Sequence, residues 1–137
     1  TIHINLFGPH PIVVFGTPEQ KKRWLVPLIE GREQTCFGVA EPDAGLDTTR
    51  IKTRAEKVSG GYIVNGRKIW TSTAQVAHKI LLLTRTTPRE DCAKPHQGMT
   101  LFYTDLDRSK IEVQRIEKMG RAAVDSNATF IDNLFIP

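Results

Sequence analysis

The first quarter of the chain has the hydrophobic spacing of an α-helix. One helical face carries apolar side chains three or four positions apart, formed by Trp24, Leu25, Leu28 and Ile29. Thr17, Pro18 and Gln20 form a start signal in which the threonine caps the helix and the glutamine completes a capping box. We expect the helix to end at Gly31, with a kink or a restart at Pro27, which lacks the N–H that the helix needs. The preceding apolar run, residues 11–15, is expected to be a short helix or an extended plug.

From Gln34 onward the pattern changes to short β-branched and aromatic runs separated by Gly, Pro, Asn and Asp, which is typical of strands. The expected strands are Thr35–Ala40, Thr49–Val58, Tyr62–Val64, Arg67–Thr71, His78–Thr86, Met99–Thr104, Ile111–Ile116 and Ala128–Ile136.

Two of these segments have a more specific pattern. Asn65-Gly66 predicts a two-residue type I′ turn that joins its flanking strands into a hairpin. The continuous apolar centre of residues 80–83 indicates a strand buried on both faces. Between Thr87 and Gln97, two prolines and four charged residues predict a surface loop.

About seven short strands without intervening helices favour an antiparallel β-barrel, or a sandwich, preceded by one or two short helices. A parallel α/β sheet is disfavoured. Neither a strand-GxGxxG-helix unit nor a Walker A loop is present, so any nucleotide must be held by strand ends and loops.

Composition narrows the class further. At 137 residues and 39% hydrophobic content, the chain is long enough to bury one core. The net charge of +4 is spread along the chain, with one short basic run at residues 21–23, so a nucleic-acid partner is not expected. Cys36, Cys92 and four scattered histidines lack the spacing of a metal site or a disulfide framework. No apolar stretch approaches the length of a membrane span.

The candidate chemistry lies in FGVAEPDAGLDTTRIKTRA, residues 37–55, and in KIWTS, residues 68–72. A bound isoalloxazine needs donors along its pyrimidine edge, a flat apolar cover for one ring face and close backbone approach to the pyrophosphate. Backbone N–H groups where a strand runs into a loop, the indole of Trp70, the hydroxyl of Ser72 and the missing Cβ of Gly45 supply these features.

Each feature also has a simpler interpretation. Glu-Pro-Asp-Ala-Gly is a turn in most proteins, and a lone Trp70 is more often part of a core than a cofactor platform. Arg50, Lys52 and Arg54 alternate on one expected strand face, where they are solvated or contact phosphates or a neighbouring subunit. The joint pattern of the two segments is what favours a flavin site.

Over nearly its whole length the sequence resembles the acyl-CoA dehydrogenase family, through FGTPEQKKRWLVPLIEG, FGVAEPDAGLD, NGRKIWTS and RIEKMGRAAVDSNATFIDNLFIP. EPDAGLD is similar to that family's EPGAGSD motif, and Trp70 to Ser72 are similar to its WIT motif. The resemblance implies that residues 1–33 end an N-terminal helical domain and residues 34–137 form the middle β-barrel domain. Since the chain opens on Thr1 and ends at Pro137 after a strand-like run, we expect a fragment of a longer protein.

The resemblance implies FAD as cofactor and gives each motif position a role. Phe37, Val39 and Ala40 would meet the flavin edge, and Gly45 and Leu46 would lie by the pyrophosphate. Trp70 would cover the ring, Ser72 would donate to N5, and Thr71 between them would also belong to the cofactor site.

Several positions depart from the family pattern: Phe37 stands where Tyr is frequent, Ala40 replaces Thr or Ser, Leu46 replaces the Ser of EPGAGSD, and Asp43 replaces its Gly. Loss of the serine hydroxyl would remove a hydrogen bond worth about 1 kcal/mol.

The implied reaction is α,β-dehydrogenation of an acyl-CoA thioester, in which a carboxylate removes the α-proton and hydride passes to flavin N5. In the family that base comes from a C-terminal helical domain, so we expect no catalytic residue in this chain and no turnover by it alone. An electron-transfer flavoprotein is the expected acceptor, and the parent is expected to be a homodimer or homotetramer. Its expected location is the cytoplasm in bacteria, and mitochondria or peroxisomes in eukaryotes.

Two other classes remain open from the sequence. One is an acyl-CoA oxidase or a flavin monooxygenase on the same scaffold. The other is a non-catalytic β-barrel binding module that has lost FAD, to which Leu46 and Ala40 would point.

Overall fold

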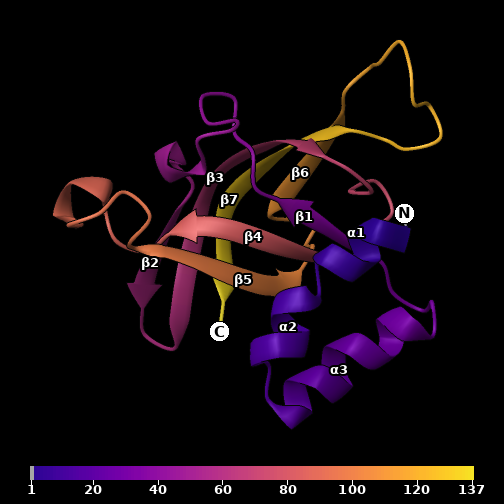
Figure 1. Cartoon of the computed structure of the whole chain (residues 1–137), viewed down its shortest axis with the longest axis horizontal. Helices are drawn as coiled ribbons and strands as arrows, with labels where there is room; N and C mark the ends of the chain where they lie inside the picture. The colour runs from indigo at the N-terminus through magenta and orange to yellow at the C-terminus, as the bar shows by residue number, and fades with distance from the viewer. Residues whose placement is uncertain (1) are drawn as a thin grey trace.

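The computed structural model describes the backbone of residues 2–137 and the side chains of residues 5–137, so Thr1 and the side chain of His3 lie outside the described residues. Helices α1 (Ile2–Phe7), α2 (His10–Phe15) and α3 (Pro18–Ile29) come first. Seven strands follow, which are β1 (Thr35–Gly38), β2 (Arg54–Val58), β3 (Gly61–Thr71), β4 (Lys79–Arg85), β5 (Met99–Asp105), β6 (Ile111–Arg115) and β7 (Asn127–Ile136) (Figure 1). The predicted mainly β fold with preceding helices is confirmed.

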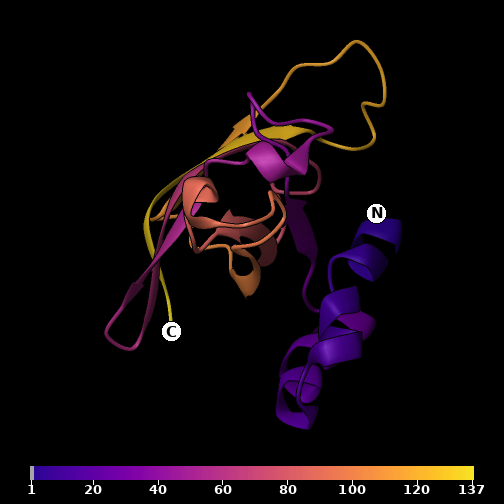
Figure 2. The ribbon, with the colours of Figure 1, turned by 60° about the vertical axis from the view of Figure 1, so that its left-hand side comes forward.

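Helix α3 begins as its sequence predicts. The Thr17 hydroxyl accepts a hydrogen bond from the Gln20 backbone N–H at 3.2 Å, and the Gln20 side chain accepts one from the Thr17 N–H at 2.9 Å. The helix runs through Pro27 and ends at Ile29 without a break. Helices α2 and α3 stand beside the sheet rather than between its strands (Figure 2).

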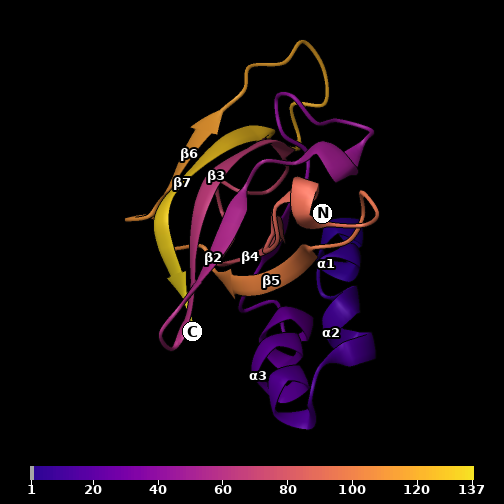
Figure 3. The same cartoon turned by 90° about the vertical axis from the view of Figure 1, so that its left-hand side faces the viewer.

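The strands form one curled sheet in the order β1-β4-β2-β3-β7-β6, with β5 paired to β4. In Figure 3 the long strands β3 and β7 bend around the side that holds β4 and β5. The sheet is mixed rather than wholly antiparallel: β1 runs parallel to β4, and β2 meets β4 in parallel at Arg54 and Arg85. The β2–β3 hairpin lies between β1 and β4 in the sequence, and this long crossover is what parallel pairing requires.

The core lies inside the curl. Strand β4 supplies Ile80, Leu81 and Leu82, each at most 3% exposed, as predicted for a strand covered on both faces. Residues from the other strands complete the cluster, among them Ala55, Val64, Ile111, Ile131 and Leu134. Each fully buried Leu or Ile contributes about 1.5–3 kcal/mol by leaving water.

The predicted hairpin at Asn65-Gly66 is wrong. Strand β3 passes straight through this dipeptide, and the turn between β2 and β3 lies at residues 59–60 instead. Asn65 and Gly66 mark a bulge in the β3–β7 pairing, where the Asn65 side chain accepts a hydrogen bond from the Asn133 N–H at 2.8 Å. Gly66 has φ 153°, and a Cβ there would come within 2.7 Å of the Thr53 Cα. The glycine therefore serves a close backbone approach rather than a turn.

The strand expected at Thr49–Val58 starts only at Arg54. Residues 48–50 form a 3₁₀ turn, whose first N–H groups are capped by Asp47, which accepts from the Thr49 N–H at 3.1 Å. Local capping by an aspartate competes with strand pairing. Arg50 and Arg54 therefore do not share one strand face.

Candidate functional site

The EPDAGLD segment folds as a tight turn. Glu41 and Ala44 bridge each other through two backbone hydrogen bonds of 3.0 and 3.1 Å, and the side chain of Ala44 is buried. Gly45 and Leu46 follow on the outside: a Cβ at Gly45 would meet nothing within 4 Å, and Leu46 is fully exposed. The turn thus presents open backbone at the positions expected to lie by a pyrophosphate.

The buried side chain of Glu41 links this turn to neighbouring segments through hydrogen bonds. Its side chain is 5% exposed and accepts hydrogen bonds from the backbone N–H groups of Lys52 (2.6 Å) and Thr53 (3.0 Å) and from Lys68 Nζ (2.8 Å). Burial by itself would raise the pKa of Glu41, but the hydrogen bonds from Lys68, Thr53 and Lys52 outweigh it and lower that pKa. Glu41 is therefore a buried structural carboxylate whose oxygens are occupied.

Lys68 is the residue that joins the two motifs, and sequence reasoning gave it no role. Its fully buried ammonium also donates to the carbonyl oxygens of Val39 (3.1 Å) and Leu83 (2.6 Å), so all three of its protons have acceptors. Burial lowers the pKa of Lys68, while Glu41 opposes that shift. The sequence signal that could have identified Lys68 is its inward position on a strand, where a charged side chain needs a partner because an unpaired buried charge is not tolerated.

The two candidate segments consequently lie side by side. The Ile69 N–H donates to the Ala40 carbonyl at 2.9 Å, one residue before Trp70, and Lys68 binds the adjacent Val39 carbonyl. Phe37 on β1 is 40% exposed, and Val39 and Ala40 are half-buried. The predicted flavin-edge residues are thus at the surface and next to the strand that carries Trp70.

Trp70 sits in a β-bulge. Opposite β7, the pair Ile69 and Trp70 faces the single residue Ala128, and Trp70 has φ 62°, a left-handed conformation that is rare outside glycine. Strict alternation would place Trp70 on the inward face of Lys68. The extra residue turns the indole outward instead, where it is 58% exposed.

Thr71 and Ser72 differ in their exposure. The Thr71 side chain is 1% exposed and its hydroxyl has no partner among the described residues, so this hydroxyl does not reach the surface where an outside ligand would bind. Ser72 is half-buried at the end of β3. Of the sequence-predicted site residues, Phe37, Gly45, Leu46 and Trp70 are therefore open to solvent, and Val39, Ala40 and Ser72 are partly open.

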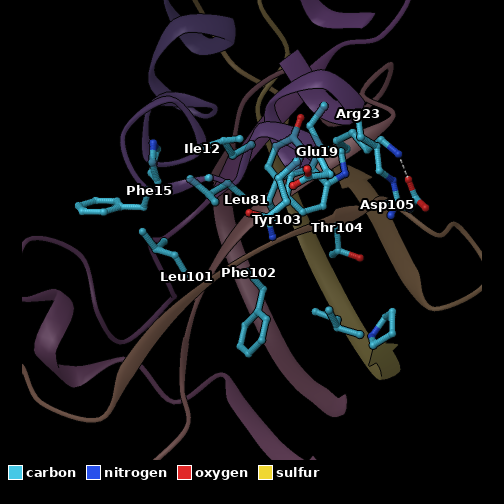
Figure 4. Close-up of a pocket in the computed structure, with 17 residues that line it drawn as sticks. Ile12, Phe15, Glu19, Arg23, Leu81, Leu101, Phe102, Tyr103, Thr104 and Asp105 are labelled. Carbon is cyan, nitrogen blue, oxygen red and sulfur yellow. Dashed lines mark hydrogen bonds and ion pairs between the residues drawn. The ribbon is translucent and has the colours of Figure 1, made fainter. Parts of the chain in front are cut away.

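A cavity of about 750 Å³ lies elsewhere, between α2 and α3 on one side and β4 and β5 on the other (Figure 4). Its walls are largely apolar and include Ile12, Phe15, Trp24, Leu101 and Phe102. None of the predicted cofactor residues lines it. This cavity follows the seam between the helices and the sheet, where Trp24 meets Tyr103 edge-on at 5.4 Å.

A second groove, of about 650 Å³, lies next to the EPDAGLD turn and is strongly basic. Six cationic residues line it, compared with two acidic ones, Glu56 and Glu90. The cationic residues are Arg50, Lys52, Arg54, Lys57, Arg85 and Arg89. Such an excess of positive charge attracts anionic ligands.

The comparisons with known proteins decide the family. The model of the acyl-CoA dehydrogenase middle domain matches residues 36–134. The chain belongs to the acyl-CoA dehydrogenase family. It is 34% identical to acyl-CoA dehydrogenase FadE34 of Mycobacterium tuberculosis over 98% of this chain and 18% of that protein. It is 32% identical to mitochondrial 2-methylacyl-CoA dehydrogenase of Solanum tuberosum over 89% of this chain and 29% of that protein.

A solved structure of butyryl-CoA dehydrogenase from Megasphaera elsdenii superposes with a TM-score of 0.84, at 31% identity, over 93% of this chain and 33% of that chain. The chain therefore spans about a third or less of these relatives and covers their middle domain. None of the helices in the described part of the chain has both the length and the apolar character that a membrane crossing requires.

The extra negative charge of Asp43 is paired with two neighbouring cationic side chains. Its carboxylate pairs with Lys52 at 3.3 Å and with Arg67 at 3.8 Å, and all three side chains are more than half exposed. An anionic ligand at the turn thus meets a screened, paired carboxylate rather than a bare one.

Proposed function

We propose that this chain is the flavin-contacting part of an FAD-dependent acyl-CoA dehydrogenase, whose parent enzyme removes hydrogen from the α and β carbons of an acyl-CoA thioester. The observation that carries the proposal is the outward-turned indole of Trp70 beside the open EPDAGLD turn, fixed there by the buried Glu41–Lys68 pair. The family assignment supports the same function.

The residues present fit FAD. The exposed faces of Trp70 and Phe37 suit an aromatic ring system, the half-buried Ser72 offers a hydroxyl, and backbone donors are available around Val39 and Ala40. Gly45 leaves room for a bulky phosphate, and the neighbouring basic groove attracts the phosphates of nucleotide ligands. When bound, FAD supplies the hydride acceptor, while these residues bind and orient it.

The general base is proposed to come from another part of the parent. Glu41 is the carboxylate of the motif, but three hydrogen bonds occupy its oxygens and its side chain is buried. A base must reach the substrate proton within hydrogen-bond distance, and Glu41 has no such access. The chain mixed with FAD and an acyl-CoA is expected to show no flavin bleaching, and turnover would refute this assignment.

For the parent enzyme we propose an acyl-CoA substrate, an electron-transfer flavoprotein as acceptor, and a homodimeric or homotetrameric assembly. Residues 1–33 and 34–137 are proposed to belong to its helical and β-barrel domains. We propose a location in the cytoplasm of a bacterium, or in mitochondria or peroxisomes of a eukaryote; the relatives include a bacterial protein and a mitochondrial plant protein.

A fluorescence titration tests FAD binding by the chain. The flavin emission of FAD is expected to fall as wild-type chain is added, because the Trp70 indole quenches a ring that it covers. Trp70→Ala should weaken binding about tenfold, the loss of one stacking contact of about 1–1.5 kcal/mol. Trp24→Phe is the matched control, since Trp24 packs on Tyr103 at the helix seam. Equal effects of the two substitutions would contradict the proposed site.

A further inference from the structure

The backbone that carries Trp70 continues into a second unusual conformation. Thr73 has φ 70°, so two non-glycine residues in the left-handed region bracket Thr71 and Ser72. Such residues cost of order 1–3 kcal/mol each and persist only where the surroundings fix them. After Thr73 the chain forms a single helical turn, in which the Val76 and Ala77 N–H groups donate to the Thr73 carbonyl at 3.1 and 3.0 Å.

Two residues from the start of β7 and the loop before it fix this conformation. Asn127 is completely buried, and its side-chain NH₂ donates to the Thr71 carbonyl at 2.8 Å. The Asp125 carboxylate accepts the backbone N–H groups of Thr73 at 3.0 Å and Gln75 at 3.2 Å. Ser72 is therefore held on both sides, through the carbonyl of the residue before it and the N–H of the residue after it.

The two side chains are also bound to each other and to the turn. The Asn127 NH₂ donates to Asp125, and the Gln75 side chain donates to the side-chain oxygen (Oδ1) of Asn127 at 2.7 Å. Burial would raise the pKa of Asp125, but hydrogen bonds from Asn127, Gln75 and Thr73 lower it. The carboxylate is thus held in the charged form that makes the strongest hydrogen bonds to N–H groups.

The opposite end of the turn has a partner of opposite charge. Arg108 Nη2 donates to the carbonyl oxygens of Ala74 at 2.8 Å and of Gln75 and Ala77 at 3.2 Å each. A carboxylate thus meets the free N–H groups at the start of the turn, and a guanidinium meets the free carbonyl groups at its end. Both charges match the partial charges of the backbone they contact.

We propose that Asp125 and Asn127 are positioning residues for the flavin contact, which hold the Thr71–Gln75 backbone so that Ser72 and Trp70 face the cofactor. This inference rests on the proposed function. The two residues act at a distance of more than fifty positions in the sequence and touch Ser72 only through its neighbours. Loss of either should loosen the turn while leaving the core formed by β4 untouched.

A double-mutant cycle on the 137-residue chain tests this. In the Trp24→Phe background, FAD affinity is measured for Ser72→Ala, Asn127→Ala and the double variant. We expect each single substitution to raise the Kd about tenfold, and the double variant to lie close to Asn127→Ala alone, because an unpositioned hydroxyl contributes nothing further. Additive effects would show that Asn127 acts on overall stability only, and would overturn the proposal.

Amide hydrogen exchange provides a test that needs no FAD. Asn127→Ala and the milder Asp125→Asn should speed exchange of the Val76 and Ala77 amides about tenfold, since these bonds belong to the turn, without changing exchange in β4. Asp91→Asn, which removes the same charge from an exposed loop, is the matched control. Unchanged exchange in the turn overturns the positioning role. If wild type fails to bind FAD while the turn still loosens in the variants, the proposed function is contradicted, but the role of Asp125 and Asn127 in holding the Thr71–Gln75 backbone is supported.

Discussion

At the scale of single residues, the buried Glu41–Lys68 ion pair is expected to contribute strongly to stability. Both groups are buried, and each satisfies backbone atoms in addition to its partner. Glu41→Gln leaves the Lys68 ammonium without a counter-charge, so the free energy of unfolding should fall by about 3–5 kcal/mol. Denaturant unfolding measures this. Asp43→Asn, at an exposed carboxylate two residues away, should change it by less than about 0.5 kcal/mol. Similar losses in both variants would contradict this account of the pair.

The same pair predicts how stability depends on pH. The pKa of Glu41 is lower in the folded chain than its ordinary value of 4.5, so the folded state binds its proton less readily than the unfolded state. This contribution is complete above the unfolded pKa and is lost as the pH falls through the folded one. Unfolding curves between pH 7 and pH 3 should show this loss, and Glu41→Gln should have a shallower acid dependence than wild type. If the stabilities of wild type and Glu41→Gln fall in parallel with pH, then protonation of Glu41 is not coupled to unfolding.

At the scale of elements, β3 owes its shape to its two irregularities against β7. Gly66→Ala adds a methyl group within 2.7 Å of the Thr53 Cα, at a φ of 153° that L-residues rarely adopt. We expect a loss of about 2–4 kcal/mol in thermal or denaturant unfolding. Gly45→Ala is the control: its new Cβ meets nothing within 4 Å, so stability should stay within about 0.5 kcal/mol. A neutral Gly66→Ala would mean that the bulge tolerates a side chain.

These irregularities also mark what sequence patterns can predict. The capping box of α3, the buried run of β4 and the last three strands follow from local periodicity and were predicted closely. The bulges were not predicted, because a bulge depends on the pairing with the partner strand. The dipeptide Asn-Gly occurs in hairpin turns as well as in bulges, so its sequence alone does not distinguish the two. The hairpin prediction failed for that reason.

The residues of the candidate site also differ in how far the sequence predicts them. The motif residues Trp70 and Gly45 were identifiable from local sequence, whereas Lys68, Asp125 and Asn127 act through hydrogen bonds to distant backbone. Buried polar partners of this kind are set by tertiary structure. Of these three residues, only Lys68 has a recognisable sequence signal, which is a charged side chain at an inward position of a predicted strand.

At the scale of the whole molecule, the curled sheet brings the two motifs together near the ends of β1 and β3, while the helices flank a separate apolar cavity (Figures 1 and 4). The parallel β1–β4 pairing places Phe37 beside β4, and the Ala40–Ile69 hydrogen bond brings that segment to the bulge. We propose that FAD binds beside Trp70 and the neighbouring basic groove rather than in the apolar cavity next to the helices.

An NMR titration of the ¹⁵N-labelled chain with FAD tests this assignment most directly, because it locates even weak binding. We expect the NMR signals of the Trp70 indole N–H and of the Ser72, Gly45 and Val39 amides to shift with one common Kd, while the signal of the Trp24 indole does not move. Shifts confined to Trp24 and the residues that line the helix-side cavity, or no shifts at millimolar FAD, would contradict it.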